Sequence, residues 1–239
     1  FFSPPPPATP DSVASRGLGD VYKRQLLTYP NLADPDGEVV FENEQVVLQR
    51  LVVGPGEWEG IHSHPGNQLY VHIRGGLWSG REGGEVTYVG PADADGSVGW
   101  MDAIPLSEEH ESGNVGDEAI DLIYVTLKRD LPIAPEIERM PQTYPNIRME
   151  RLLENDRMIV QRGQIEPGQW TGIYSHPGNQ IYLLIKGGNW SERQGGVQQS
   201  AGYSEAGSVG WFDAVEQSEG REAGNIGETT IDFVLVTLK

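Results

Sequence analysis

The stretch that decides the fold is Gly56 to Gly75, which reads GEWEGIHSHPGNQLYVHIRG. His62 and His64 are separated by one residue in a segment that we expect to be extended. Because alternate residues of a strand project to the same face, both imidazoles can point into one interior. Gln68 follows a Pro-Gly turn at the start of the next strand, and His110 comes much later in the chain.

The chain contains two tandem copies of one module. Four pairs of segments match: TYPN at 28–31 and 143–146, SHPGNQ at 63–68 and 175–180, GSVGW at 96–100 and 207–211, and the closing IDLIYVTLK and IDFVLVTLK. The offset between matching residues is 115 for TYPN, 112 for SHPGNQ and 111 for the last two pairs. We therefore predict domains at 26–128 and 141–239, joined by a linker at 129–140.

Short apolar runs broken by turn residues are spread along both copies. QVVLQRLVV, NQLYVHIRGG and AIDLIYVTLK are separated by Gly- and Pro-containing turns. Strands of this length and spacing predict an all-β sandwich or closed barrel in each copy. The six tryptophans fall into three repeat pairs, which we expect to pack in the core and rim. Sugar stacking is the alternative for Trp78 and Trp190, because each follows a Gly-Gly or Gly-Asn turn.

Composition excludes several classes of function. The 239 residues carry a formal net charge of −18, which argues against nucleic acid or an anionic membrane as a partner. The absence of cysteine excludes disulfides and thiolate chemistry. No apolar run has the length of a membrane span and no secretion signal is visible, so we expect a soluble protein. Residues 1–25 are Pro-rich and end in a segment resembling translated sequencing-adapter sequence; we expect this tail to be non-native or disordered.

The first copy resembles the cupin family, and the whole chain resembles a bicupin. The quoted stretch is similar to the family's first motif, with Gln68 where a glutamate is usual. His110 with Asn114 four residues later is similar to the second motif. The resemblance implies two jelly-roll barrels. It also implies that His62, His64, Gln68 and His110 bind one divalent transition metal.

The ligand set narrows the metal chemistry. Three imidazoles and an amide oxygen suit first-row ions; copper and iron are favoured, and manganese, nickel and zinc are alternatives. Such a set is neutral, so the ion keeps its full divalent charge. This favours either copper redox chemistry or Lewis-acid activation of a carbonyl, hydroxyl or water.

The second copy departs from the motif. Tyr174 replaces His62 and Arg221 replaces His110, while His176 and Gln180 remain. Arginine is permanently cationic and offers no lone pair, so we predict no metal there. One interpretation is a module retained for stability and for an intramolecular pseudo-dimer. The other is that Tyr174, His176, Gln180 and Arg221 bind an anion or a substrate carboxylate.

Two more residues of the first copy face the predicted interior. Strand parity places Tyr70 and His72 on the same side as Gln68, so both are candidate catalytic residues, with simple packing as the alternative. By family analogy we expect an oxidoreductase acting on an oxygen-rich small molecule or carbohydrate. The alternatives are an isomerase or lyase of sugars or unsaturated uronates, and a non-catalytic binding or sensor module. A homodimer is a further option.

Overall fold

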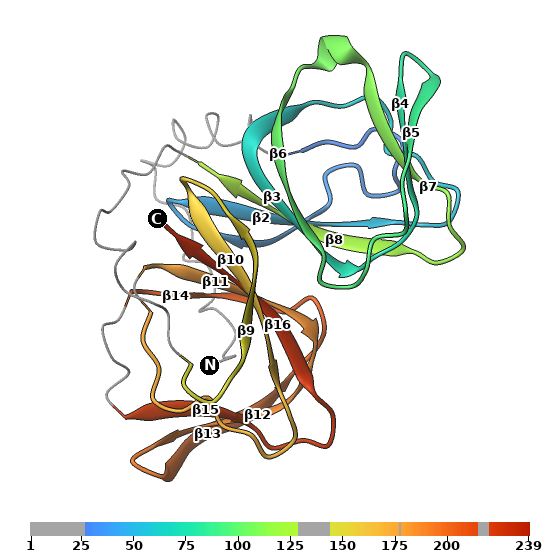
Figure 1. Ribbon diagram of the computed structural model, residues 1–239. Coiled ribbons are helices and arrows are strands. Elements are labelled where there is room, and N and C mark those ends of the chain that lie inside the picture. The colour runs from blue at the N-terminus through green and yellow to red at the C-terminus, as the bar shows by residue number, and fades with distance from the viewer. Residues whose placement is uncertain (1–26, 129–143, 177, 215–219) are drawn as a thin grey trace, which may run out of the picture. The chain divides into compact units, whose positions relative to one another are not determined.

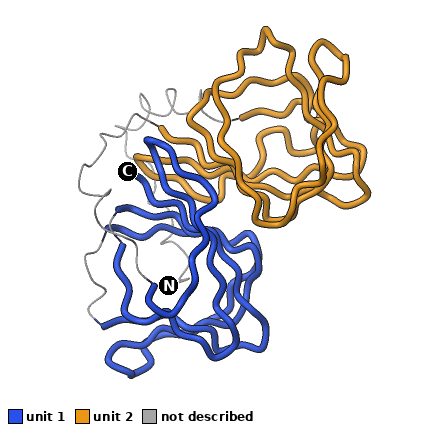
Figure 2. The backbone as a smooth tube through the Cα atoms, viewed as in Figure 1, with its two compact units in different colours: residues 1–6, 131–239 blue, residues 7–130 orange. Residues whose placement is uncertain are grey.

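The computed structural model describes residues 27–128, 144–176, 178–214 and 220–239, which form two compact units divided at about residue 130 (Figures 1 and 2). The predicted tail at 1–25 and linker at 129–140 lie outside the described residues. Within these residues, no helix combines the length and apolar character needed to cross a bilayer.

The first unit along the chain, which is unit 2 (orange) in Figure 2, is a barrel of two antiparallel sheets. Its five-stranded sheet has the order β1-β2-β8-β3-β6 and its three-stranded sheet the order β5-β4-β7. The strands are β1 (Glu38–Glu42), β2 (Val46–Val53), β3 (His64–Arg74), β4 (Trp78–Glu82), β5 (Glu85–Val89), β6 (Val98–Ile104), β7 (His110–Asn114) and β8 (Ile120–Leu127), with a single 3-10 turn, η2 (Leu106–Glu108).

The second unit repeats this topology. Its sheets have the orders β9-β10-β16-β11-β14 and β13-β12-β15, so every strand has a counterpart in the first unit. The strands are β9 (Met149–Glu154), β10 (Met158–Ile165), β11 (Gln180–Lys186), β12 (Gly188–Gln194), β13 (Val197–Ser204), β14 (Val209–Phe212), β15 (Arg221–Asn225) and β16 (Ile231–Leu238). The predicted all-β class and the two jelly-roll barrels are confirmed.

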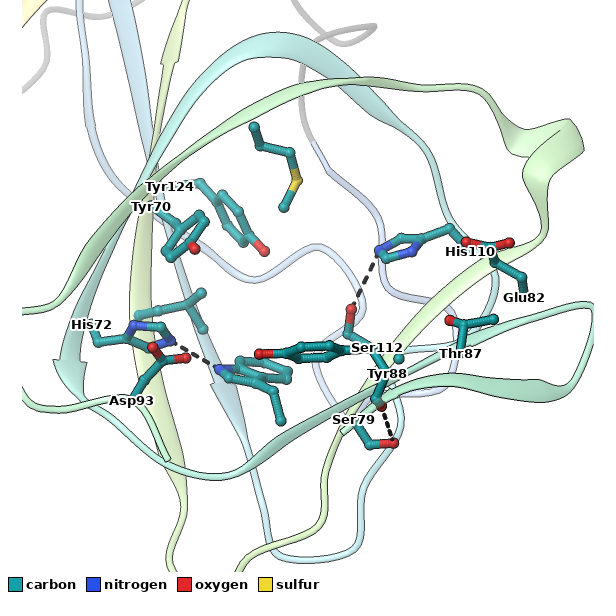
Figure 3. A pocket seen from close by; sticks show the side chains of 14 residues that line it. Tyr70, His72, Ser79, Glu82, Thr87, Tyr88, Asp93, His110, Ser112 and Tyr124 are labelled. Carbon is teal, nitrogen blue, oxygen red and sulfur yellow. Dashed lines mark hydrogen bonds between the residues drawn. The ribbon is translucent and has the colours of Figure 1, made fainter. Parts of the chain in front are cut away.

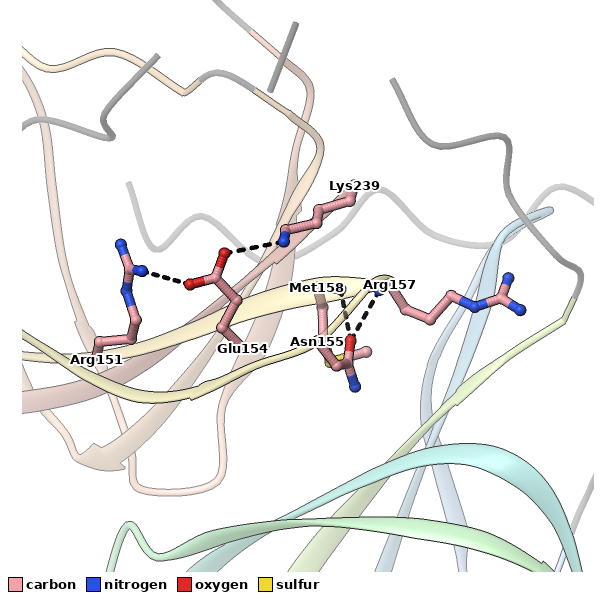
Figure 4. A network of polar contacts seen from close by, with 6 residues as sticks. All are labelled: Arg151, Glu154, Asn155, Arg157, Met158 and Lys239. Carbon is pink, nitrogen blue, oxygen red and sulfur yellow. Dashed lines mark hydrogen bonds and ion pairs between the residues drawn. The ribbon is translucent and has the colours of Figure 1, made fainter. Parts of the chain in front are cut away.

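Both barrels close their first hairpin with the same side chains. In the second barrel the Asn155 Oδ1 atom accepts the backbone N–H groups of Arg157 (2.8 Å) and Met158 (3.0 Å), and Glu154 binds Lys239 and Arg151 (Figure 4). In the first barrel Asn43, Glu42 and Lys128 make the corresponding contacts. Asparagine satisfies turn N–H groups that no strand reaches, which explains why both copies retain it.

Two further contacts hold the sheets in both units. Arg50 forms a bidentate ion pair with Asp121 across β2 and β8, and Arg162 pairs with Asp232 in the same way. A tryptophan carries an arginine over its ring, with Arg81 3.2 Å from the centroid of Trp58, and Arg193 over Trp170 in the second barrel. These paired contacts belong to the fold rather than to a site.

Candidate metal centre and adjoining cavity

Three of the four histidines of the first barrel come together from two separate segments of the chain. His64 is the first residue of β3, His62 lies two residues before it, and His110 is the first residue of β7. One ligand nitrogen of each lies within 4.8 Å of the other two, and the rings meet at centroid distances of 4.7 to 5.5 Å. The three side chains therefore lie together, and their predicted role as metal ligands stays a prediction.

The hydrogen bonds of His62 and His64 determine which nitrogen faces the site. The Nδ1 atom of His62 lies 2.8 Å from the Gly60 carbonyl, and that of His64 lies 3.0 Å from the Gln68 Oε1 atom. Carbonyl oxygens only accept, so each ring carries its proton on Nδ1. The two Nε2 atoms face one another at 2.9 Å. Two lone pairs at that distance repel each other, and a divalent metal that accepts both would remove this repulsion, so such an ion fits these residues.

Burial keeps the cluster neutral. Desolvation lowers the pKa of His62 to about 4 and that of His64 to about 3. The pKa of His110 is also lowered, chiefly by burial, although the surrounding glutamates oppose this. At neutral pH all three imidazoles therefore present lone pairs, as metal binding requires.

Gln68 contacts His64 on the side of the ring opposite to the facing Nε2 atoms. A β-bulge separates it from His64, where Gly66 and Asn67 adopt positive φ angles of 81° and 53°. The Gln68 amide nitrogen donates to the Thr126 hydroxyl at 2.8 Å, so both ends of the amide have protein partners. In this arrangement Gln68 orients His64, and its predicted role as a fourth ligand stays a prediction.

Glu59 lies beside the histidine cluster, next to His62, and sequence reasoning missed it. Its side chain is fully buried, with an Oε2 atom 3.6 Å from the His62 Nε2 atom. Neither carboxylate oxygen makes a hydrogen bond of standard geometry among the described residues, although the Ser112 side chain is close enough to lower the Glu59 pKa. Burial raises its pKa to about 8. Comparison of the two copies could have drawn attention to Glu59, because the matching position of the second copy, which also lacks two of the histidines, is Thr171.

A cavity of about 370 Å³ opens beside the cluster and includes His110 in its wall (Figure 3). The rings of Tyr70 and Tyr124 lie together on one side, with His110 and Ser112 across from them. The 14 lining residues are Tyr70, His72, Trp78, Ser79, Gly80, Glu82, Thr87, Tyr88, Asp93, Met101, His110, Ser112, Leu122 and Tyr124. Sequence reasoning selected Tyr70 and His72 but missed Tyr124, whose ring lies 5.8 Å from that of His64.

His72 lies in the cavity wall with both ring nitrogens engaged. The Trp78 indole donates to its Nε2 atom at 2.9 Å, and its Nδ1 atom lies 2.9 Å from the Ser97 hydroxyl. An indole N–H is only a donor, so His72 is neutral and carries its proton on Nδ1. This geometry gives His72 the role of holding Trp78 at the cavity; its predicted catalytic role stays a prediction.

The second barrel is filled with aromatic side chains where the first has its site. Tyr174 and His176 stack with ring centroids 4.9 Å apart, and the Tyr144 hydroxyl lies 2.8 Å from the His176 Nε2 atom. Phe212 packs on His176 at 5.1 Å. Arg221 begins β15 with its side chain exposed, close enough to lower the pKa of Tyr174, although burial raises that pKa more. Gln180 donates to Thr237. The predicted anion site there stays a prediction.

Comparisons with known proteins bear on the fold. No protein-family model matches the sequence, and no curated protein matches it. Among solved structures, AerE from Microcystis aeruginosa has a TM-score of 0.59 at 13% identity, covering 84% of this chain and 90% of its own. A Bacillus subtilis oxalate decarboxylase with Mn(II) centres has a TM-score of 0.53 at 13% identity, covering 82% of this chain and 69% of its own.

A third structure, the cupin 2 conserved barrel domain protein from Leptotrichia buccalis, has a TM-score of 0.48 at 12% identity, covering 84% of this chain and 88% of its own. At such identities structural similarity establishes the fold and nothing finer. The TM-scores above 0.5 for AerE and the oxalate decarboxylase, with the strand order described above, show that this chain shares their two-barrel jelly-roll fold.

Proposed function

We propose that the first barrel is a mononuclear divalent-metal oxidoreductase acting on an uncharged, oxygen-rich organic or carbohydrate substrate. The observation that carries this proposal is the position of His110, which belongs both to the histidine cluster and to the wall of the 370 Å³ cavity. A molecule bound in the cavity lies next to whatever His62, His64 and His110 hold. The bound ion supplies redox or Lewis-acid chemistry at that point.

The cavity lining supports an uncharged substrate. It contains two carboxylates, Glu82 and Asp93, and no lysine or arginine among its described residues. Such a wall repels a substrate carboxylate unless the metal itself binds it. Tyr70, Tyr88, Tyr124 and Trp78 combine apolar ring faces with hydroxyl or indole groups, a pattern that suits sugars and phenols. The lining therefore disfavours uronates, the substrates of the isomerase or lyase alternative.

The metal is proposed to be a first-row ion. Three neutral imidazoles suit copper, iron, manganese, nickel and zinc alike. The Mn(II) centres of the Bacillus subtilis oxalate decarboxylase support including manganese beside copper and iron in the first reconstitution.

The test begins with metal analysis of protein purified without added metal. Apoprotein reconstituted separately with Cu, Fe or Mn would then be assayed for oxygen consumption with neutral sugars, polyols and phenols. We expect metal-dependent consumption that disappears in His62→Ala. Anaerobic turnover of unsaturated uronates that is unchanged with Zn would support the isomerase or lyase instead. Failure to bind any of these ions would leave a non-metal binding module.

A further inference from the structure

The first barrel contains two side chains that could complete the histidine cluster, and their contacts differ. Gln68 is satisfied at both ends of its amide, by His64 and by Thr126. The carboxyl group of Glu59 is as deeply buried but makes no hydrogen bond of standard geometry among the described residues. Because burying an acid that makes no standard hydrogen bond is destabilising, whether it is protonated or ionised, its presence calls for a ligand that compensates it.

The Gln68–Thr126 contact belongs to the barrel rather than to the metal site. In the second barrel Gln180 donates to Thr237 at the same 2.8 Å. That barrel has Tyr174 and Arg221 at the positions of His62 and His110. A contact that is unchanged where the histidine cluster is missing does not depend on a metal.

Glu59, by contrast, is replaced together with the histidines. Thr171 takes its place in the second barrel, where the hydroxyl accepts the Ala223 N–H at 3.0 Å and donates to the Gly172 carbonyl at 2.9 Å. The buried, unpaired acid of the first barrel is thus exchanged for a neutral side chain with all its hydrogen bonds made. The carboxylate occurs only in the copy that has the three histidines.

The Glu59 carboxyl group also lies where it could reach a metal bound by the histidines. Its Oε2 atom lies 3.6 Å from the Nε2 atom of His62, the nitrogen that the Gly60 hydrogen bond turns toward the cluster. We propose that Glu59 is the fourth protein ligand of the metal site and that Gln68 acts as a positioning residue for His64. This inference rests on the proposed metal site and specifies its ligands.

The assignment changes the charge of the site. Three imidazoles with a glutamine leave the divalent charge uncompensated, whereas three imidazoles with Glu59 neutralise one unit of it. An anionic ligand stabilises the higher oxidation state of a redox metal, so the site is better suited to redox chemistry than the neutral set expected from the motif.

The experiment is a matched pair of substitutions in the full chain, Glu59→Leu and Gln68→Leu, each removing the polar atoms at similar volume. Apoprotein would be titrated with Co(II) and Mn(II), with affinity and the visible Co(II) spectrum as readouts. For Glu59→Leu we expect an affinity loss above about 100-fold and a changed spectrum at saturation. For Gln68→Leu we expect a loss of about 10- to 100-fold, as for residues that orient a ligand, with the wild-type spectrum.

Two results would overturn the assignment while leaving the metal site intact. In one, Glu59→Leu keeps the wild-type affinity and spectrum; in the other, only Gln68→Leu changes the spectrum. No binding by the wild type would overturn the proposed function as well. Apoprotein melting temperatures report folding, and Glu59→Leu is expected to melt no lower than wild type because it removes a buried, unpaired acid. If Glu59→Leu does not fold, Glu59→Gln replaces it, with the same expected loss of affinity.

Discussion

The two barrels have the same framework and different interiors. The hairpin asparagines Asn43 and Asn155, the Arg–Asp pairs and the Gln–Thr pairs recur contact for contact. The barrel interior differs, because His62, Glu59 and His110 of the first copy become Tyr174, Thr171 and Arg221 in the second. Sheet contacts determine whether the barrel folds, whereas a few inward-facing residues determine whether it holds a site.

The space beside the site differs as well. Met101 and Tyr124 line the cavity of the first barrel, and their counterparts Phe212 and Leu235 belong to the packed interior of the second. Stacked rings of Tyr144, Tyr174 and His176 fill that interior. The second barrel has therefore replaced the histidine cluster with packed aromatic side chains, although the buried Gln180 Oε1 atom has no hydrogen-bond partner among the described residues.

The most severe test of this comparison is the removal of matching histidines. His64→Ala should abolish high-affinity metal binding, because it removes a ligand from the centre of the cluster. His176→Ala should leave one metal per chain, since Tyr174 and Arg221 offer no site. Metal stoichiometry after dialysis measures both variants. Equal loss from the two would contradict the assignment of the site to one barrel.

The paired tryptophans give the next largest difference. Trp190 is buried in the core of the second barrel, and Trp190→Ala should lower the free energy of unfolding by about 3–5 kcal/mol. Trp78 lies in the cavity wall, so Trp78→Ala should cost less stability and mainly raise KM for the substrate. Denaturant titration and steady-state kinetics separate the two effects, and a core-sized loss of stability in Trp78→Ala would refute the distinction.

The pH dependence of stability is a third test, and it concerns the second barrel. Burial lowers the pKa of His176 to about 4, whereas an exposed histidine has a pKa near 6.5. The unfolded chain therefore binds the proton first, and stability present above about pH 6.5 is lost as the pH falls toward 4, by at most about 3 kcal/mol.

His176→Gln should flatten this part of the pH profile. Urea titrations of the metal-free protein between pH 4 and 7 measure it. The same slope in wild type and variant would show that His176 does not titrate as its burial requires.

The smallest expected effect concerns the two glutamines. Gln68→Leu and Gln180→Leu each break the same bond to a buried threonine, so both should lose a similar stability of about 1–3 kcal/mol. Only Gln68→Leu should also weaken metal binding, because only Gln68 accepts a hydrogen bond from a histidine of the cluster. Weaker metal binding in Gln180→Leu would contradict the assignment of the metal site to the first barrel alone.

Much of the fold could be predicted from the sequence. The period-two strand patterns and the repeated motifs indicated two β-barrels, because strand periodicity and turn residues are local properties. The spacing of His62 and His64 placed both in one site for the same reason. His110 was assigned through resemblance, and its convergence with the other two required β7 to pair beside the loop preceding β3.

The residues that were missed depend on contacts across the barrel. Nothing in the local pattern around Glu59 distinguishes it from the surface glutamates nearby; only its burial without a partner does so. Gln68 matched the motif as a ligand, yet the bulge at Gly66 and Asn67 allows its oxygen to accept from His64. Tyr124 lies on a largely apolar strand, and its place in the cavity wall follows from the pairing of β8 with β3.

The sequence by itself determined the architecture, the repeat and the copy that keeps its histidines, because these follow from residue types and their spacing along the chain. The tertiary structure alone decided which polar groups are left without partners and where the cavity opens. Hydrogen bonding and desolvation depend on neighbours brought together from distant strands, and no spacing along the chain specifies them.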